Sequence, residues 1–254
     1  MILDSFRLDG KVALVTGSSR GLGQGAALAL AEAGADVALL DRGDASATAD
    51  LIAATGRRVH RVQRDLVSAT PDELASAVDE VVAELGGLDI LVNNAGTIRR
   101  APAVDYPLDD WDDVLAINLD AVFHLSQSAG RHMLSQGSGR IINVASMLSF
   151  QGGILVPAYT ASKHAVAGLT KALANEWAAA GVTVNAVAPG YMATDNTAPL
   201  RADEDRAASI LSRIPAGRWG EASDLQGVFV FLASDAAAYL TGAVIPVDGG
   251  WLVR

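Results

Sequence analysis

Short apolar stretches alternate with helix-length segments along most of the chain. The strand-like stretches are KVALVTG, DVALLD, RVHRVQRD, LDILVNNAG, GRIINVAS, VTVNAVAPG and GAVIPVDGG. Few hairpin turn signals separate them, so each strand is expected to be followed by a helical crossover. Parallel strands joined in this way are buried on both faces. The pattern therefore predicts an α/β fold with a parallel sheet of about seven strands and helices on both faces.

No low-complexity linker and no repeat of fixed period divides the 254 residues. The simplest prediction is a single doubly wound, Rossmann-type domain that spans residues 1–254. The segment 191–215 is rich in charge and is interrupted by Pro199 and Pro215, which predicts one or two short helices. Because this segment follows the end of an apolar strand, it is a candidate substrate lid.

Composition narrows the classes of function. No apolar stretch approaches the roughly 18 residues that a membrane span requires. A formal net charge of −10, without a cluster of Lys and Arg, argues against a nucleic-acid surface. The first residues have neither the basic start nor the apolar run of a signal peptide, so a cytoplasmic protein is expected. The chain has no cysteine and its histidines lack metal-ligand spacing, so no metal site is expected.

Three glycines lie where the first predicted strand passes into a helix. Gly17, Gly21 and Gly23 are spaced G-x-x-x-G-x-G in the stretch VTGSSRGLG. Glycines at such a turn let the backbone and the helix N-terminus approach a pyrophosphate. Asp41 ends the next strand 18 residues after Gly23, close to the interval of about 20 at which an acidic residue binds ribose hydroxyls. Together these features predict a dinucleotide site.

Asp41 also bears on which dinucleotide binds. Its carboxylate accepts a hydrogen bond from a ribose 2′-hydroxyl but repels a 2′-phosphate, which favours NAD over NADP. Arg20 and Arg42 argue for the opposite choice, because either guanidinium could hold a phosphate. The acidic residue is the stronger signal, and NAD is the expected cofactor.

The stretch YTASK places a tyrosine and a lysine four residues apart at the start of an alanine-rich helical segment. Tyr159 and Lys163 share one helix face. A neighbouring ammonium stabilises the phenolate and lowers the phenol pKa from about 10, so the pair is a candidate general acid/base. Ser146 ends an apolar strand, at the edge where ligands bind open parallel sheets. Its hydroxyl could hold the substrate oxygen.

The features TGSSRGLG, NNAG, Asn118, Ser146, YTASK and PGYMAT occur in this order along the chain. In this combination the chain resembles the short-chain dehydrogenase/reductase family over essentially its whole length. The resemblance implies hydride transfer between a nicotinamide and an alcohol or ketone. It implies that Asn118, Ser146, Tyr159 and Lys163 are catalytic, with Asn118 holding a water in a proton relay linked to the lysine.

The same resemblance implies which residues contact the cofactor. Asp65 is expected at the adenine, Lys163 at the nicotinamide ribose, and the backbone after Pro189 with the Thr194 hydroxyl at the carboxamide. The full expected set is Gly17, Ser19, Arg20, Gly21, Leu22, Gly23, Asp41, Asp65, Leu66, Asn93, Ala95, Gly96, Tyr159, Lys163, Pro189, Gly190, Met192 and Thr194. The resemblance further implies a homotetramer, built through the long helices of the site and the C-terminal VDGGWLVR.

The substrate is less well determined than the reaction. Arg99 and Arg100 follow the fourth predicted strand, where a guanidinium could pair with a carboxylate, but they could equally face solvent or another subunit. Stretches such as NNAGTIRRAP and APGYMATDN resemble family members that act on small sugar acids, which implies 2-keto-3-deoxy-D-gluconate or 2-deoxy-D-gluconate as the substrate. The expected substrate residues are Arg99, Arg100, Ser146, Gln151, Tyr159, Tyr191 and Asn196.

Two other functions stay open. An NADPH-dependent ketone reductase of the same family, such as a gluconate 5-reductase or a 3-oxoacyl reductase, would use the same catalytic residues, and Asp41 speaks against it. A non-enzymatic NAD-sensing protein on the same fold would not need the intact set of Ser146, Tyr159 and Lys163.

Overall fold

Seven parallel strands form one sheet at the centre of the molecule in the computed structural model, which describes residues 1–254. The strands are β1 (Val12–Thr16), β2 (Asp36–Asp41), β3 (Val59–Gln63), β4 (Ile90–Asn93), β5 (Gly139–Val144), β6 (Val182–Pro189) and β7 (Val244–Val247). Their order is β3-β2-β1-β4-β5-β6-β7, and every neighbouring pair is parallel. The predicted single doubly wound domain with about seven strands is confirmed.

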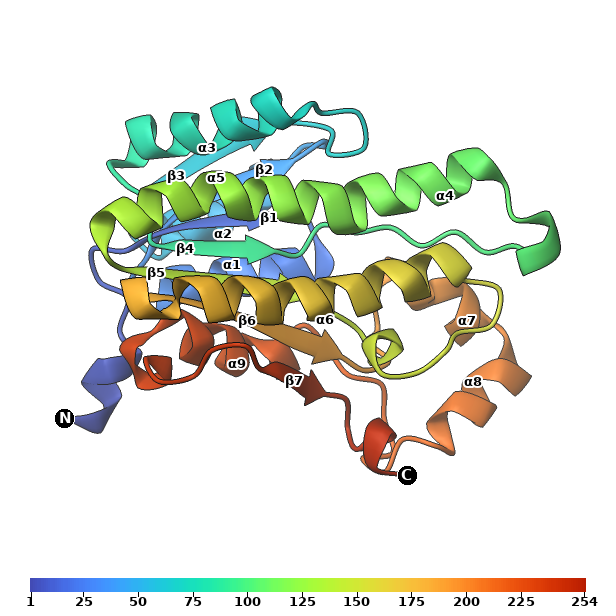
Figure 1. Cartoon of the computed structure of the whole chain (residues 1–254). Helices are drawn as coiled ribbons and strands as arrows, with labels where there is room; N and C mark the ends of the chain where they lie inside the picture. The colour runs from blue at the N-terminus through green and yellow to red at the C-terminus, as the bar shows by residue number, and fades with distance from the viewer.

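Helices cover both faces of the sheet (Figure 1). One face is covered by α1 (Gly21–Glu32), α2 (Ser46–Ala54) and α9 (Ser223–Ala233), and the other by α3 (Pro71–Leu85), α5 (Ala121–Gln136) and α6 (Pro157–Trp177). Helix α4 (Leu108–Leu115) leads into α5 through a π-helical turn, η3 (Ala116–Asp120). The 3-10 turns are η1 (Ile2–Phe6), η2 (Ala103–Asp105), η4 (Met147–Ser149), η5 (Ala178–Ala180), η6 (Asp195–Thr197), η7 (Asp235–Ala237) and η8 (Trp251–Val253).

Each strand divides its side chains between two apolar layers. In β1, Val12 and Leu14 join the layer under α3, α5 and α6, whereas Ala13 and Val15 join the layer under α1, α2 and α9. The layers contain 24 and 23 buried residues, so the two faces are covered about equally. This two-sided burial explains why the strands are nearly continuous apolar runs in the sequence.

The carboxyl ends of β1 and β4 are joined by side-chain hydrogen bonds. The Thr16 hydroxyl accepts from the backbone N–H groups of Asn94 and Ala95 at 3.0 and 2.9 Å. In return, the Asn94 amide donates to the carbonyls of Thr16 and Gly17 at 2.9 and 3.1 Å. Strand order changes direction between these two strands, which is where open α/β sheets bind ligands.

The segment 191–215 lies beyond the carboxyl ends of the strands (Figure 1). It contains η6 followed by two short helices, α7 (Ala198–Ala202) and α8 (Glu204–Leu211), as the sequence predicts. Ile210 and Ile214 anchor it by packing with Met147 and Trp251 in a small separate core cluster. The segment is thus tied to the loop after β5 and to the C-terminus.

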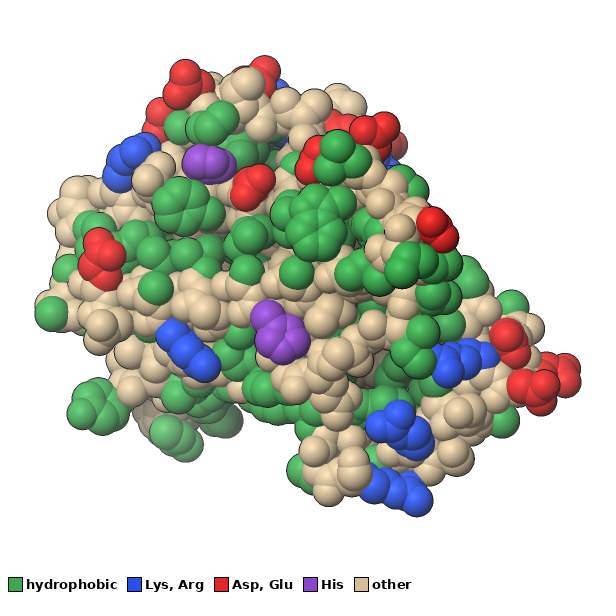
Figure 2. Space-filling view, turned by 45° about the vertical axis from the view of Figure 1, so that its right-hand side comes forward, with side chains coloured by type: hydrophobic (Ala, Val, Ile, Leu, Met, Phe, Trp, Pro, Cys, Tyr) green, Lys and Arg blue, Asp and Glu red, His purple; other side chains and the backbone are tan.

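Apolar side chains spread across the face that α5 and α6 present (Figure 2). On α5, Phe123 and Leu134 are 38% and 36% exposed. None of the helices combines the length and the hydrophobicity that a membrane crossing would require.

Candidate active site

The loop between β1 and α1 has the geometry of an anion cradle. Gly17 and Gly21 adopt φ angles of +63° and +58°, which side chains disfavour. A Cβ on Gly23 would lie 2.1 Å from the Gly17 carbonyl oxygen. No side chain caps the first turn of α1, so its N–H groups and the positive end of its dipole are free to face an anion. The glycines expected at a dinucleotide pyrophosphate fit that group.

Asp41 is held rigidly beside this loop. Its two carboxylate oxygens accept from the backbone N–H groups of Ser19 and Gly43, both at 2.9 Å. Arg20 pairs with Asp195 of η6 at 2.7 Å, across the site. Arg42 is exposed and forms no ion pair. The charge that backbone hydrogen bonds fix beside this loop is therefore the carboxylate of Asp41.

Lys163 and Tyr159 occupy the first turns of α6 on one face, as the sequence predicts. The Lys163 Nζ atom lies 5.6 Å from the centroid of the Tyr159 ring. Lys163 is 4% exposed and donates from Nζ to the Val144 carbonyl at 2.6 Å. Burial lowers the pKa of Lys163 to about 8, because the charged form loses water.

The pKa of the Tyr159 phenol differs from the expectation based on the sequence. Burial raises the pKa of Tyr159, while the Ser146 hydroxyl and the Arg100 guanidinium act in the opposite direction. The sequence argument expected Lys163 to lower this pKa. In the structure its ammonium is bonded to the Val144 carbonyl, and the loss of water around the phenol dominates.

Ser146 opens the loop that follows β5 and faces the phenol of Tyr159. Its Oγ atom accepts from the Leu148 backbone at 3.2 Å. The nearby Ser149 hydroxyl donates to the Lys163 carbonyl at 2.7 Å and so fastens the loop to α6. Ser146, Tyr159 and Lys163 are thus brought together by the end of one strand and the start of one helix.

Asn118 is fully buried in the π-helical turn η3, in which the Ala121 N–H donates to the Ala116 carbonyl five residues earlier. Its Oδ1 atom accepts from the Thr97 N–H at 2.9 Å. Its amide donates to the Thr97 carbonyl at 3.0 Å and to the Ser162 hydroxyl at 3.2 Å. Both hydrogens of the Asn118 side-chain amide are therefore donated to protein groups. The expected role of Asn118 in a water relay stays a prediction, in which a water would bind to an oxygen of this residue.

Two residues expected at the cofactor do not bring their side chains to the site. Asn93 is 2% exposed, and its amide donates to Ser126 and Asn143 at 3.0 and 2.9 Å within the helix-covered layer. Met192 is 4% exposed and packs in the core near Gly220. Strand alternation in β4 directs the Asn93 side chain inward, and the Met192 side chain packs into the core beside Gly220.

The two adjacent arginines have different surroundings. Arg99 pairs with Asp110 and Asp113 of α4 at 3.3 and 3.9 Å. Arg100 forms no ion pair, and its Nη2 atom donates to the Asn196 carbonyl at 3.4 Å. Arg99 is therefore neutralised on the outside of the site, whereas Arg100 reaches across to η6 with its charge free.

Sequence reasoning did not identify three residues that join loops of the site. Thr16 and Asn94 join the loops of the site, although Asn94 belongs to the NNAG stretch that drew attention. The indole of Trp251 donates to the Gln151 side chain at 2.9 Å. Trp251 is 100 residues from its partner, and no local spacing connects such distant positions.

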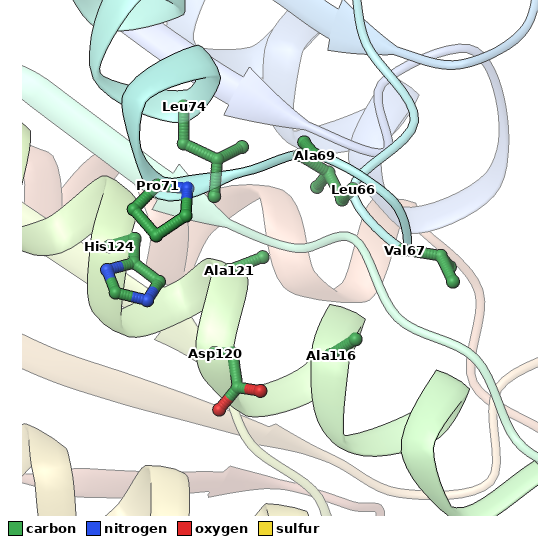
Figure 3. Close-up of a pocket in the computed structure, with 9 residues that line it drawn as sticks. All are labelled: Leu66, Val67, Ala69, Pro71, Leu74, Ala116, Asp120, Ala121 and His124. Carbon is green, nitrogen blue, oxygen red and sulfur yellow. The ribbon is translucent and has the colours of Figure 1, made fainter. Parts of the chain in front are cut away.

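Two cavities lie outside the group of Ser146, Tyr159 and Lys163. One of about 240 Å³ opens between the loop after β3 and the start of α5 (Figure 3). It is lined by Leu66, Val67, Ala69, Pro71, Leu74, Ala116, Asp120, Ala121 and His124. Of the expected cofactor residues only Leu66 lies there. No group of three or more His, Asp or Glu side chains is arranged to hold a metal ion.

Known proteins similar to this chain have the same length and fold. A family model described as enoyl-(acyl carrier protein) reductase matches residues 17–252. A 2-dehydro-3-deoxy-D-gluconate 5-dehydrogenase of Escherichia coli (strain K12) is 55% identical over 255 residues, with 100% of each chain covered.

Two solved structures superpose closely on the chain. A candidate 2-deoxy-D-gluconate 3-dehydrogenase of Agrobacterium tumefaciens with bound NADP is 51% identical, with a TM-score of 0.92 and coverage of 99% and 100%. A gluconate 5-dehydrogenase of Burkholderia cenocepacia in complex with NADP and tartrate is 40% identical, with a TM-score of 0.95 and full coverage of both chains.

The buried amine of Lys163 predicts a specific pH dependence of stability. Its pKa is about 8 in the folded protein and about 10.4 in an unfolded chain. Between these values only the unfolded chain keeps the proton, so the folded state gains stability as the pH rises. Relative to Lys163→Met, the wild-type free energy of unfolding should increase by up to about 3 kcal/mol over this window.

Urea unfolding at several values from pH 7.5 to 10.5 measures this difference. Lys171→Met is the matched control, because Lys171 is an exposed lysine on the same helix. Its difference from wild type should stay constant with pH. Parallel curves for wild type and Lys163→Met would show that the amine titrates normally.

Proposed function

Because the chain belongs to the short-chain dehydrogenase/reductase family, we propose that it exchanges a hydride between a nicotinamide dinucleotide and a hydroxyl or ketone of a small sugar acid. The family resemblance predicted from the motifs is confirmed. The observation that carries the proposal is the grouping of Ser146, Tyr159 and Lys163 beside a glycine cradle for a dinucleotide.

The catalytic residues divide the work of proton handling. When bound, the nicotinamide ring supplies the acceptor or donor of the hydride. As the phenol, Tyr159 donates its proton to the carbonyl oxygen when a ketone is reduced, and as the phenolate it accepts the hydroxyl proton in the reverse direction. The raised pKa of Tyr159 keeps the phenol protonated near neutrality, which suits donation to a ketone. Ser146 holds the same substrate oxygen, and Lys163 fixes the helix that carries the phenol.

The substrate proposed first is 2-keto-3-deoxy-D-gluconate, also named 2-dehydro-3-deoxy-D-gluconate. Support comes from the relative of that name, which is 55% identical along the whole chain. 2-Deoxy-D-gluconate is the second candidate, from the name of a structure that is 51% identical. Gluconate 5-reduction is the alternative, supported by a more distant gluconate 5-dehydrogenase at 40% identity.

Arg100 is the residue that we assign to the substrate carboxylate. It acts on the pKa of Tyr159, so its charge is felt at the reacting phenol. It carries no carboxylate partner, whereas Arg99 already has two. A guanidinium with free donors pairs well with a carboxylate, which supports Arg100 over Arg99 as the anchor of a sugar acid.

NAD is the proposed cofactor, although two similar structures contain NADP. Asp41 is fixed by two backbone hydrogen bonds and cannot easily turn away from a 2′-phosphate. Use of NADP is the alternative, and Arg42 would be its phosphate ligand because Arg20 is paired with Asp195. The other expected cofactor residues, including Asp65 at the adenine and Thr194 at the carboxamide, belong to this proposal.

The remaining parts of the proposal come from the sequence and from the family resemblance. From the sequence pattern, residues 191–215 would serve as a substrate lid, with Tyr191 and Asn196 at its inner side, and a cytoplasmic location is expected. The family resemblance implies a homotetramer, and the apolar face over α5 and α6 supports association (Figure 2). A non-enzymatic NAD sensor is disfavoured because it would not require the catalytic group.

Assays of nicotinamide absorbance test the reaction directly. The wild-type protein should oxidise 2-keto-3-deoxy-D-gluconate with the oxidised dinucleotide, or reduce its oxidation product with the reduced dinucleotide, and should be far less active on a simple secondary alcohol. Tyr159→Phe should lower kcat by about 10²- to 10⁴-fold, because it removes the exchangeable proton. Equal activity of the two proteins would contradict the catalytic assignment, and activity on neutral alcohols alone would contradict the sugar-acid substrate.

Exchange of Asp41 tests the choice of dinucleotide. The wild type should have a higher kcat/KM with NAD than with NADP. Asp41→Asn keeps the size and one acceptor but removes the charge, so the NADP/NAD ratio of kcat/KM should rise by about ten- to a hundredfold. Arg42→Ala is the companion variant and should weaken NADP use in the Asp41→Asn background. A wild type that prefers NADP would overturn the assignment.

Paired arginine variants test the carboxylate anchor. Arg100→Met should raise the KM for the sugar acid by about ten- to a hundredfold, because a charged hydrogen bond is lost. Arg99→Met removes the same charge from the neighbouring position and should have little effect, since its partners are Asp110 and Asp113. The reverse order of effects would assign the carboxylate to Arg99.

A further inference from the structure

The C-terminal Trp251 joins three segments that surround the substrate side of the site. Its ring is 5% exposed and lies between Tyr191, at 4.7 Å between ring centroids, and Arg213, whose guanidinium carbon is 4.0 Å from the ring centroid. Its indole N–H donates to the Gln151 Oε1 atom at 2.9 Å. One residue near the end of the chain thus contacts the loop after β5 and both the start and the end of the proposed lid.

The tail that carries Trp251 is itself held in place. The Asp248 carboxylate accepts from the backbone N–H groups of Gly250 and Leu252 at 2.8 and 2.9 Å. Arg254 donates to the Ser212 carbonyl at 2.7 Å, just after α8. Because backbone bonds fix the turn on both sides of Trp251, the indole N–H keeps a defined direction.

This direction determines which way the amide of Gln151 can face. A glutamine side chain offers one oxygen acceptor and one NH₂ donor, whereas an indole can only donate. Oε1 of Gln151 must therefore face Trp251. The Nε2 group forms no hydrogen bond within the chain and is not among the buried polar groups that lack a partner, so it remains accessible to a ligand.

We propose that Trp251 is a positioning residue that holds Gln151 with its NH₂ group presented to an acceptor oxygen of the substrate. Gln151 follows Ser146 by five residues on the loop that begins with that serine. The substrate oxygen recognised by Gln151 is thus an acceptor, as a carboxylate, a keto group or a hydroxyl lone pair would be. The inference rests on the proposed function, because it concerns recognition of the sugar acid by the same site.

Steady-state kinetics of a double-mutant cycle test the proposal. Trp251→Phe keeps a ring between Tyr191 and Arg213 but removes the N–H. The KM for the sugar acid should rise about three- to tenfold, as expected when one hydrogen bond is lost, while kcat and the KM for the dinucleotide change little. Gln151→Leu should raise the same KM at least as much. The double variant should resemble Gln151→Leu alone, because Trp251 acts through Gln151.

Trp219→Phe is the matched control. Trp219 also packs against Tyr191, at 5.6 Å between ring centroids, but makes no bond to Gln151, so its replacement should leave the KM unchanged. Effects of Trp251→Phe and Gln151→Leu that multiply in the double variant would overturn the positioning role. A KM for the sugar acid that is the same in Trp251→Phe as in the wild type would also overturn the positioning role.

Two outcomes separate this inference from the proposed function. A wild-type protein that turns over no sugar acid contradicts the proposed function itself. An active wild type with an unchanged KM in Gln151→Leu contradicts only the inference. Thermal unfolding of each variant identifies any that fails to fold, and Gln151→Leu alone still tests the donor if Trp251→Phe is such a case.

Discussion

The position of the catalytic group depends on one buried lysine. Lys163 donates from its side chain to the Val144 carbonyl, and its own carbonyl accepts from the Ser149 hydroxyl. These two bonds fasten the start of α6 to the end of β5 and to the loop that Ser146 opens. A charge with 4% exposure is costly, and its lowered pKa is the sign of that cost. The two bonds of Lys163 hold the phenol of Tyr159 next to Ser146, although burial of the ammonium is unfavourable.

A chain of buried polar side chains continues this attachment across the sheet. The Asn143 amide on β5 donates to the Thr170 hydroxyl on α6 at 2.9 Å. The Asn93 amide on β4 donates to Asn143 and to Ser126 on α5. Buried polar groups are expensive when unpaired, so sliding of α5 or α6 along the sheet would break several bonds together. The helices that carry the site are thereby held in one register, which apolar packing alone would specify less strictly.

Much of this architecture could be predicted from the sequence, because apolar runs and glycines reveal strand ends, and strand ends form the site. The direction in which individual side chains point could not be predicted from the sequence. Asn93 and Met192 lie in motifs of the site, but both side chains are buried, Asn93 by the alternation of β4 and Met192 by packing beside Gly220. The π-helical turn at Asn118 has no local sequence signal. The different surroundings of Arg99 and Arg100 depend on the acidic residues of α4, which approach only in the folded chain.

The distribution of charge explains how an acidic protein could admit an acidic substrate. A formal net charge of −10 repels anions from a distance, but salt screens exposed charges beyond about 8 Å. Near the site, Arg100, Arg201 and Arg213 come from the loop after β4 and from residues 191–215, and none of them forms an ion pair. Basic side chains accordingly gather at the lower right of Figure 2. These unpaired guanidinium groups can donate charged hydrogen bonds to a carboxylate at short range, where exposed acidic residues of distant elements are screened.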